Sequence, residues 1–97
     1  MQKIGVLPIE GFALMSFACC VETLRAANVL SGTNLYETII IGDEYDSVES
    51  AAPAQAKADA RIGDTLDLDY LFVIAAGQPE RYDNPKLTRW LARLDRQ

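Results

Sequence analysis

The stretch from residue 3 to residue 41 decides the fold: it begins with KIGVL (residues 3–7) and ends with YETIII (residues 36–41). Both runs are short and rich in β-branched or other apolar residues, and loop-forming residues follow each of them, which predicts two strands. A connection as long as residues 8–35 suits a helix that carries the chain back across a sheet. The stretch therefore predicts a strand–helix–strand unit with parallel strands and a right-handed crossover.

The residues between the two strands have the spacing of a helix. Apolar side chains recur at intervals of three and four residues, which places them on one face. The pair Ser31-Gly32 predicts the end of this helix, because glycine readily adopts the left-handed conformation at the C′ position. The apolar stripe consists of Leu14, Phe17, Ala18, Val21 and Leu24.

Residues 43–69 differ in composition from the first strand–helix–strand unit. They are acidic and rich in alanine, and Pro53 and Gly63 interrupt them. We expect two short extended pieces near Val48–Ala51 and Lys57–Arg61 that form a hairpin arm. The acidic clusters of this region lack the spacing of a metal-binding loop, so we expect their side chains to be solvated.

The last third of the chain predicts one more strand and one more helix. The run YLFVIA (residues 70–75) is continuously apolar, as in a strand buried on both faces of a parallel sheet. The pair Asn84-Pro85 suits a helix start, with Asn as the N-cap and Pro at the first helical position. This helix has an apolar stripe made of Leu87, Trp90, Leu91 and Leu94. The chain is thus predicted to be a single α/β domain over residues 1–97, a partial doubly wound, flavodoxin-like and mostly parallel sheet.

The composition excludes several classes of function. The 14 acidic and 9 basic residues give a net charge of −5, and no Lys/Arg cluster is present to bind a polyphosphate backbone directly. No apolar run approaches the ~20 residues that cross a bilayer, and the first residues lack the order of a signal peptide, so we expect a cytoplasmic protein without membrane contact. The absence of histidine removes the commonest zinc ligand and general base, and we expect no metal and no cofactor.

The two cysteines, Cys19 and Cys20, are neighbours on the predicted first helix. Adjacent helical residues point about 100° apart, so this pair suits neither a disulfide nor a shared metal ion. A nucleophilic cysteine also needs a nearby base to activate it. We therefore assign both thiols to packing and expect no catalytic residues.

Two loops are expected at the carboxyl edge of the sheet, where open α/β folds bind ligands. The first, Pro8–Phe12, lacks the glycine pattern of a dinucleotide site. The second, Ala75–Gln78, could offer backbone amides to an oxyanion or carboxylate, or Gly77 could simply turn the chain. On the first helix, Glu22 and Arg25 are spaced for a surface ion pair, and a role facing a pocket is the alternative.

Several segments together carry a family resemblance: IGVLP (residues 4–8) with Gly11 and Phe12, SFA (16–18), VETLRAAN (21–28) and the strand and turn at 70–77. They resemble the amidotransferase-like N-terminal domain of AraC-type transcription regulators, within the wider superfamily of PfpI-type peptidases and ThiJ-like proteins. The segment around residues 22–28 is the most specific. The resemblance covers essentially the whole chain but about the first half of the family domain.

The resemblance implies a sensor that binds a small effector, often nitrogen-containing, and passes its state to a DNA-binding domain. The positions that match the pocket rim are Gly11, Ser16, Glu22 and Gly77. Enzymes of the superfamily use a cysteine on a strand-to-helix elbow and an acid early in the first helix. Here Ser16 occupies the acidic position. The final helix reaches Gln97 without a stop signal or a following strand, so we expect the domain to be truncated before the elbow and to lack the two helix-turn-helix motifs.

Three functions follow as alternatives. The chain is the effector-sensing and dimerising portion of an AraC-type regulator, or a fragment of a cysteine-dependent hydrolase or amidotransferase, or a stand-alone protein that pairs with itself or with a longer relative. In each case we expect a homodimer, because few strands and two helices cannot cover both faces of a parallel sheet. On this view Trp90 and its stripe would be covered by a second copy.

Overall fold

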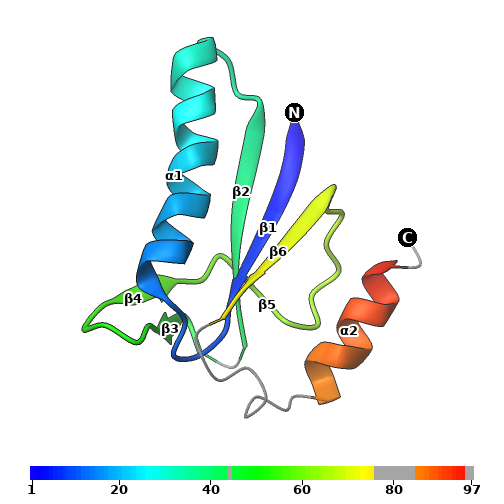
Figure 1. Cartoon of the computed structure of the whole chain (residues 1–97). Coiled ribbons are helices and arrows are strands. Elements are labelled where there is room, and N and C mark those ends of the chain that lie inside the picture. The colour runs from blue at the N-terminus through cyan, green and yellow to red at the C-terminus, as the bar shows by residue number, and fades with distance from the viewer. Residues whose placement is uncertain (44, 76–84, 96–97) are drawn as a thin grey trace.

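A computed structural model of the chain describes residues 1–43, 45–75 and 85–95, and within them a four-stranded parallel sheet forms the centre of the molecule (Figure 1). The strand order is β5-β2-β1-β6, with a separate hairpin made of β3 and β4. The sheet is parallel at every pairing. The elements are β1 (Gln2–Pro8), α1 (Leu14–Ser31), β2 (Tyr36–Gly42), β3 (Ser47–Glu49), β4 (Gln55–Lys57), β5 (Ala60–Arg61), β6 (Tyr70–Ile74) and α2 (Pro85–Asp95).

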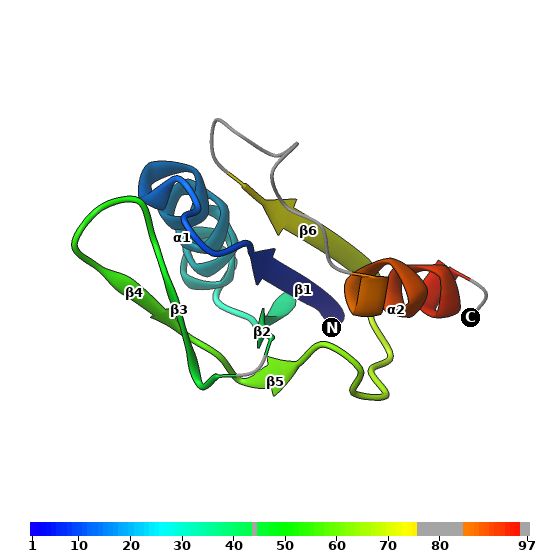
Figure 2. The same ribbon diagram turned by 90° about the horizontal axis from the view of Figure 1, so that it is seen from below.

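The two helices lie on opposite faces of the sheet, as Figure 2 shows from below. Alternate residues of β2 face opposite ways, so Ile40 packs with the α1 side while Ile39 and Ile41 pack with the α2 side. The fold class is therefore confirmed as a mixed α/β fold with a mostly parallel sheet, consistent with a partial flavodoxin-like arrangement. The core of the α2 side consists of Leu7, Ile9, Ile41, Ile62, Leu87 and Trp90, and that of the α1 side of Phe12, Val48 and Ala56.

The connection from α1 to β2 forms as the sequence predicts. Gly32 has a φ of 73°, and its N–H donates to the carbonyl oxygens of Asn28 and Val29 at 3.1 and 3.3 Å, which ends the helix. The side chain of Asn28 then receives the N–H of Tyr36 at 3.0 Å and donates to its carbonyl at 2.9 Å. One amide thus holds the helix end against the start of β2.

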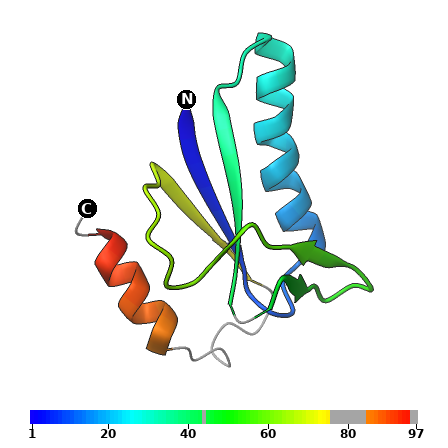
Figure 3. The ribbon, with the colours of Figure 1, turned by 180° about the vertical axis from the view of Figure 1, so that it is seen from behind.

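The predicted hairpin arm forms, but its second piece is divided between two sheets. β3 and β4 pair antiparallel, whereas Ala60–Arg61 leaves the arm and joins the main sheet beside β2. Asp59 causes this change of direction: its N–H donates to Ile40 O at 2.7 Å and its carboxylate accepts from Ile40 N at 3.0 Å. Figure 3 shows the hairpin arm of β3 and β4, in green, near the start of α1.

The last strand is less buried than its sequence predicts. β6 pairs with β1 on one side and forms an edge of the described sheet, and Tyr70, Phe72 and Val73 are about half exposed. The expectation of a strand buried on both faces is wrong for this part of the chain. An apolar run indicates that a strand favours burial, but it does not show whether other residues pack over that strand.

Helix α2 packs within the chain. Leu87 and Trp90 are buried, and the indole Nε1 of Trp90 donates to the carbonyl of Asp64 at 2.9 Å. The predicted stripe is confirmed, but the expectation that a second copy covers it is wrong, because residues of the sheet and of the segment between β5 and β6 cover it. The predicted N-cap Asn84 lies outside the described residues.

Candidate functional site

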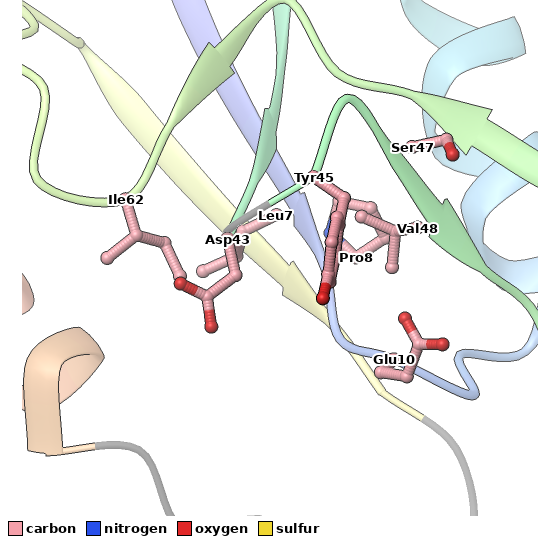
Figure 4. A pocket seen from close by; sticks show the side chains of 8 residues that line it. All are labelled: Leu7, Pro8, Glu10, Asp43, Tyr45, Ser47, Val48 and Ile62. Atoms are coloured by element: carbon pink, nitrogen blue, oxygen red, sulfur yellow. The ribbon is translucent and has the colours of Figure 1, made fainter.

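A small cavity lies at the carboxyl edge of the sheet, where β1 and β2 end (Figure 4). Its volume is about 220 Å³, which is sufficient for a small molecule but not for a dinucleotide. Parallel strands bring their carboxyl ends to one edge, so residues far apart in the sequence meet there. The lining side chains are Leu7, Pro8, Glu10, Asp43, Tyr45, Ser47, Val48 and Ile62.

The cavity combines apolar walls with a few polar groups. Four aliphatic or proline side chains form the walls, while Glu10 and Asp43 supply carboxylates and Tyr45 and Ser47 supply hydroxyls. Oxygen atoms are thus the polar lining, and two of the four groups are carboxylates. Such a site suits a small molecule with a cationic or hydrogen-bond-donating group and an apolar body.

The loop after β1 is held by the hairpin, and this contact places Glu10. The N–H of Gly11 donates to Glu49 O at 2.8 Å, and the carboxylate of Glu10 accepts from Glu49 N at 3.3 Å. Gly11 has a φ of 82°, a left-handed conformation that glycine adopts without strain. The loop and the hairpin therefore form one side of the cavity together.

The other carboxylate, Asp43, follows β2 directly. It is half-buried, its Oδ1 has no contact with solvent, and this atom lies 3.5 Å from Nζ of Lys86 on α2. The expectation that the whole 43–46 cluster is solvated is therefore wrong for Asp43, although Tyr45 and Asp46 are exposed. The reason is topological: a residue that follows a central parallel strand lies at the sheet edge, not in an outer loop.

Of the rim residues implied by the family resemblance, the three in the described part of the chain lie outside the cavity lining. Gly11 lies in the loop after β1, and Ser16 is exposed in the first turn of α1. Glu22 lies further along α1, and Gly77 lies outside the described residues. None of the three described positions lines the cavity, so their contact with a ligand stays a prediction.

Glu22 instead borders an open groove between α1 and the sheet. Its carboxylate accepts two hydrogen bonds from Arg25, each 2.8 Å long, which confirms the predicted ion pair. The hydrogen bonds from Arg25, together with its positive charge, lower the pKa of Glu22. Both residues also line the groove, whose volume is about 570 Å³, together with Phe17, Val21, Asn28, Tyr36, Thr38, Ile40, Gln55, Ala56 and Lys57.

The two cysteines lie within α1, away from any strand-to-helix turn. Cys19 is exposed, and Cys20 is half-buried, which raises the pKa of its thiol. A raised pKa leaves less of the nucleophilic thiolate at neutral pH. Among the residues that the structure describes, no group of three or more His, Cys, Asp or Glu side chains is arranged to hold a metal ion.

Sequence reasoning located the cavity edge through the loop at 8–12 but missed Glu10, Asp43 and Tyr45 as its polar lining. The available signal was positional, since each of the three follows the end of a predicted parallel strand within a few residues.

Neither helix in the described part of the chain is long and apolar enough to cross a membrane.

Comparison with known proteins shows relatives among transcription regulators, although no family model matches the chain. The chain is 34% identical over 79 residues to the HTH-type transcriptional regulator GlxA of Rhizobium meliloti, a match covering 81% of this chain and 24% of that protein. It is 32% identical over 95 residues to the HTH-type transcriptional regulator CdhR of Pseudomonas aeruginosa, covering 98% of this chain and 28% of that protein. The chain thus spans about a quarter of the length of these curated relatives.

A solved structure confirms the fold. The crystal structure of an AraC family transcriptional regulator from Pseudomonas putida matches with a TM-score of 0.82 and 21% identity, over 99% of this chain and 51% of that one. At this identity the likeness concerns the fold alone. The sequence relatives are regulators by name, and neither of the two described above is named as an enzyme.

Proposed function

We propose that this chain is the effector-sensing and dimerising portion of an AraC-type transcription regulator, with an amidotransferase-like α/β domain that has lost catalysis. The observation that carries the proposal is the similarity of nearly the whole chain to HTH-type regulators. In this proposal DNA binding belongs to another part of the regulator, because the chain has a net charge of −5. A transcription regulator of this kind acts in the cytoplasm.

The effector is a small nitrogen-containing cation that binds in the cavity at the sheet edge. Glu10 and Asp43 attract its charge, and the exposed ring of Tyr45 can cover a cationic group through its π face. The apolar walls around Leu7 and Ile62 favour the rest of the molecule. No covalent step is needed, and the thiols of α1 lie outside the set of cavity-lining residues.

The effector site is tested by thermal unfolding of the purified chain with a panel of small ammonium compounds and their uncharged analogues. A ligand at 100 times its dissociation constant adds about 2.7 kcal/mol to the stability, and each kcal/mol raises the Tm of a domain of this size by about 4–8 °C. We expect at least one ammonium compound, and not its uncharged analogue, to raise the Tm.

Two variants decide whether that ligand uses the cavity. Glu10→Gln removes one carboxylate charge and should weaken binding, whereas Asp67→Asn removes a charge from an exposed residue outside the cavity lining and should leave binding unchanged. Equal effects of the two substitutions would mean that net charge alone attracts the ligand. A panel without any stabilising cation would contradict the proposed effector class.

The enzyme alternative has no supporting observation in the site. Both thiols are mid-helix, the sequence has no histidine, and Ser16 stands at the position of the acid in the enzyme relatives. General-base assistance typically contributes ~10²–10⁴ in rate. Turnover of an amide or aldehyde substrate that is lost in Cys19→Ala would revive this alternative.

A further inference from the structure

A cation of the chain itself lies against one of the two carboxylates that line the cavity. Nζ of Lys86 is 3.5 Å from Oδ1 of Asp43, and Asp43 is a lining residue. Lys86 belongs to α2, whereas none of the lining residues in the described part of the chain comes from that helix. The contact therefore joins the cavity to a helix that does not line it.

The side chain of Lys86 crosses the loop after β5 before it reaches Asp43. A Cβ atom placed on Gly63 would lie 3.7 Å from Cε of Lys86, so the aliphatic part of the lysine runs over this glycine. The same loop is bound by the next turn of α2, because the indole N–H of Trp90 donates to Asp64 O at 2.9 Å. The loop and the helix together hold the ammonium group of Lys86 within reach of Asp43.

The contact between Lys86 and Asp43 can open without disturbing the core. The side chain of Lys86 is 50% exposed and that of Asp43 is 42% exposed, so the ammonium group can move into water at a small desolvation cost. Its distance of 3.5 Å also exceeds the length of about 2.7–2.9 Å that a charge-assisted hydrogen bond reaches. A ligand cation that approaches the carboxylate more closely can therefore replace Lys86.

A cationic ligand in the cavity competes with Lys86 for the same carboxylate. Two positive charges a few ångströms apart repel each other, so the ligand and Lys86 oppose each other at Asp43. A site whose binding form is present in about one molecule in ten binds its ligand about tenfold more weakly. Lys86 thus sets how strongly a cation must interact with Asp43 in order to bind.

We propose that Lys86 is an internal competitor of the cationic effector at Asp43, and that the effector displaces its ammonium group on binding. The inference rests on the proposed cavity and effector class, and it adds the residue that sets the affinity and transmits binding to α2. The coupling is reciprocal, so a change that moves Lys86 away from Asp43 must raise the affinity of the cavity for cations.

Binding of tetramethylammonium chloride to the purified chain tests the competition, followed by NMR titration against sodium chloride of equal ionic strength. Lys86→Met removes the ammonium group but keeps an unbranched side chain, and it should bind tetramethylammonium about tenfold more tightly than the parent chain because the competing cation is gone. Lys86→Arg keeps the charge and should bind like the parent. A lysine with a purely structural role would give weaker or unchanged binding in Lys86→Met, and either result overturns the proposal.

Two controls separate competition from a general effect of charge. Arg89→Met removes one positive charge from an exposed position of the same helix and should leave the affinity for tetramethylammonium unchanged. An equal gain in Arg89→Met and Lys86→Met would mean that net charge alone attracts the probe, which overturns the proposal. The uncharged probe tert-butanol, which has a similar shape, should interact equally with the parent and with Lys86→Met.

The backbone amide signals of α2 provide the second readout. In the parent chain we expect tetramethylammonium to shift the signals of residues 86–90, because displacement of Lys86 changes the charges around this part of the helix. In Lys86→Met the probe still binds, but these signals should stay in place. Equal shifts in both chains would show that Lys86 does not transmit the binding and overturn its proposed role.

The titrations distinguish failure of this inference from failure of the effector site. Equal affinity for tetramethylammonium in the parent and in Lys86→Met refutes the competition and leaves the cavity as a cation site. Absence of binding in both chains contradicts the effector class and the competition together.

Discussion

Phe12 joins the loop after β1 to the hairpin arm. Its side chain is fully buried, its ring centroid lies 5.1 Å from that of Phe17, and its carbonyl accepts the N–H of Ala51 at 2.8 Å. We expect Phe12→Ala to lower the free energy of unfolding by about 3–5 kcal/mol, because the backbone contacts around it prevent the neighbours from filling the cavity.

The measurement is urea denaturation followed by far-UV circular dichroism, with Phe72→Ala as the matched control. Phe72 is 46% exposed, so the same truncation there removes less buried surface and should cost clearly less. Similar losses for the two variants would show that Phe12 has no special place in the core.

At the residue scale, the sequence predicted the edge of the site but not the side chains that line it. The loop at 8–12 was identified from Pro8 and Gly11, whereas Asp43 was assigned to a solvated cluster of acids. The position of Asp43 directly after β2 is visible in the sequence, but the approach of Lys86 is not, because Lys86 lies 3.5 Å from Asp43 Oδ1 and comes from α2 at the other end of the chain.

Among the elements, α2 has its largest buried side chain in Trp90. Trp90 is 2% exposed and donates its indole N–H to Asp64 O at 2.9 Å. Trp90→Phe retains an aromatic ring but removes that donor, and we expect a loss of about 1–3 kcal/mol, because the carbonyl of Asp64 loses its bond. Trp90→Ala also removes the ring and should cost about 3–5 kcal/mol.

The parent protein supplies a direct readout, since Trp90 is its one tryptophan. Its buried indole should emit at short wavelength and shift to longer wavelength when α2 detaches. We expect the fluorescence and circular dichroism transitions to coincide in urea. A fluorescence transition at clearly lower urea would mean that α2 detaches before the sheet unfolds.

The elements themselves were largely predictable because each has a local cause. The β-branched run of β2, the glycine stop at Gly32 and the stripe of α2 depend on neighbours in sequence, and the structure confirms all three elements. The strand pairing of Lys57–Arg61 was not predictable in the same way. Its division depends on the contacts between Asp59 and Ile40, which lie 19 residues apart.

Considered as a whole, the described sheet has an apolar edge at β6. Tyr70, Phe72 and Val73 are about half exposed there, and an unpaired strand edge can add strands from other molecules. We expect Val73→Lys to reduce light scattering on heating, because a charged side chain at an edge opposes strand addition.

The control for the edge variant is Thr65→Lys, which adds the same charge at an exposed loop position. It corrects for the general effect of net charge on solubility. If both variants reduce scattering equally, the edge is not the site of aggregation.

The position of β1 between β2 and β6 has a consequence for synthesis on the ribosome. β1 is made before both of its neighbours, and its second neighbour is complete only when residue 74 has been added. At roughly 5–20 residues per second, the strand waits several seconds for its last partner. During that interval Ile4, Val6 and Leu7, which are buried in the finished sheet, lack their full cover, so chaperones can bind these side chains on the nascent chain.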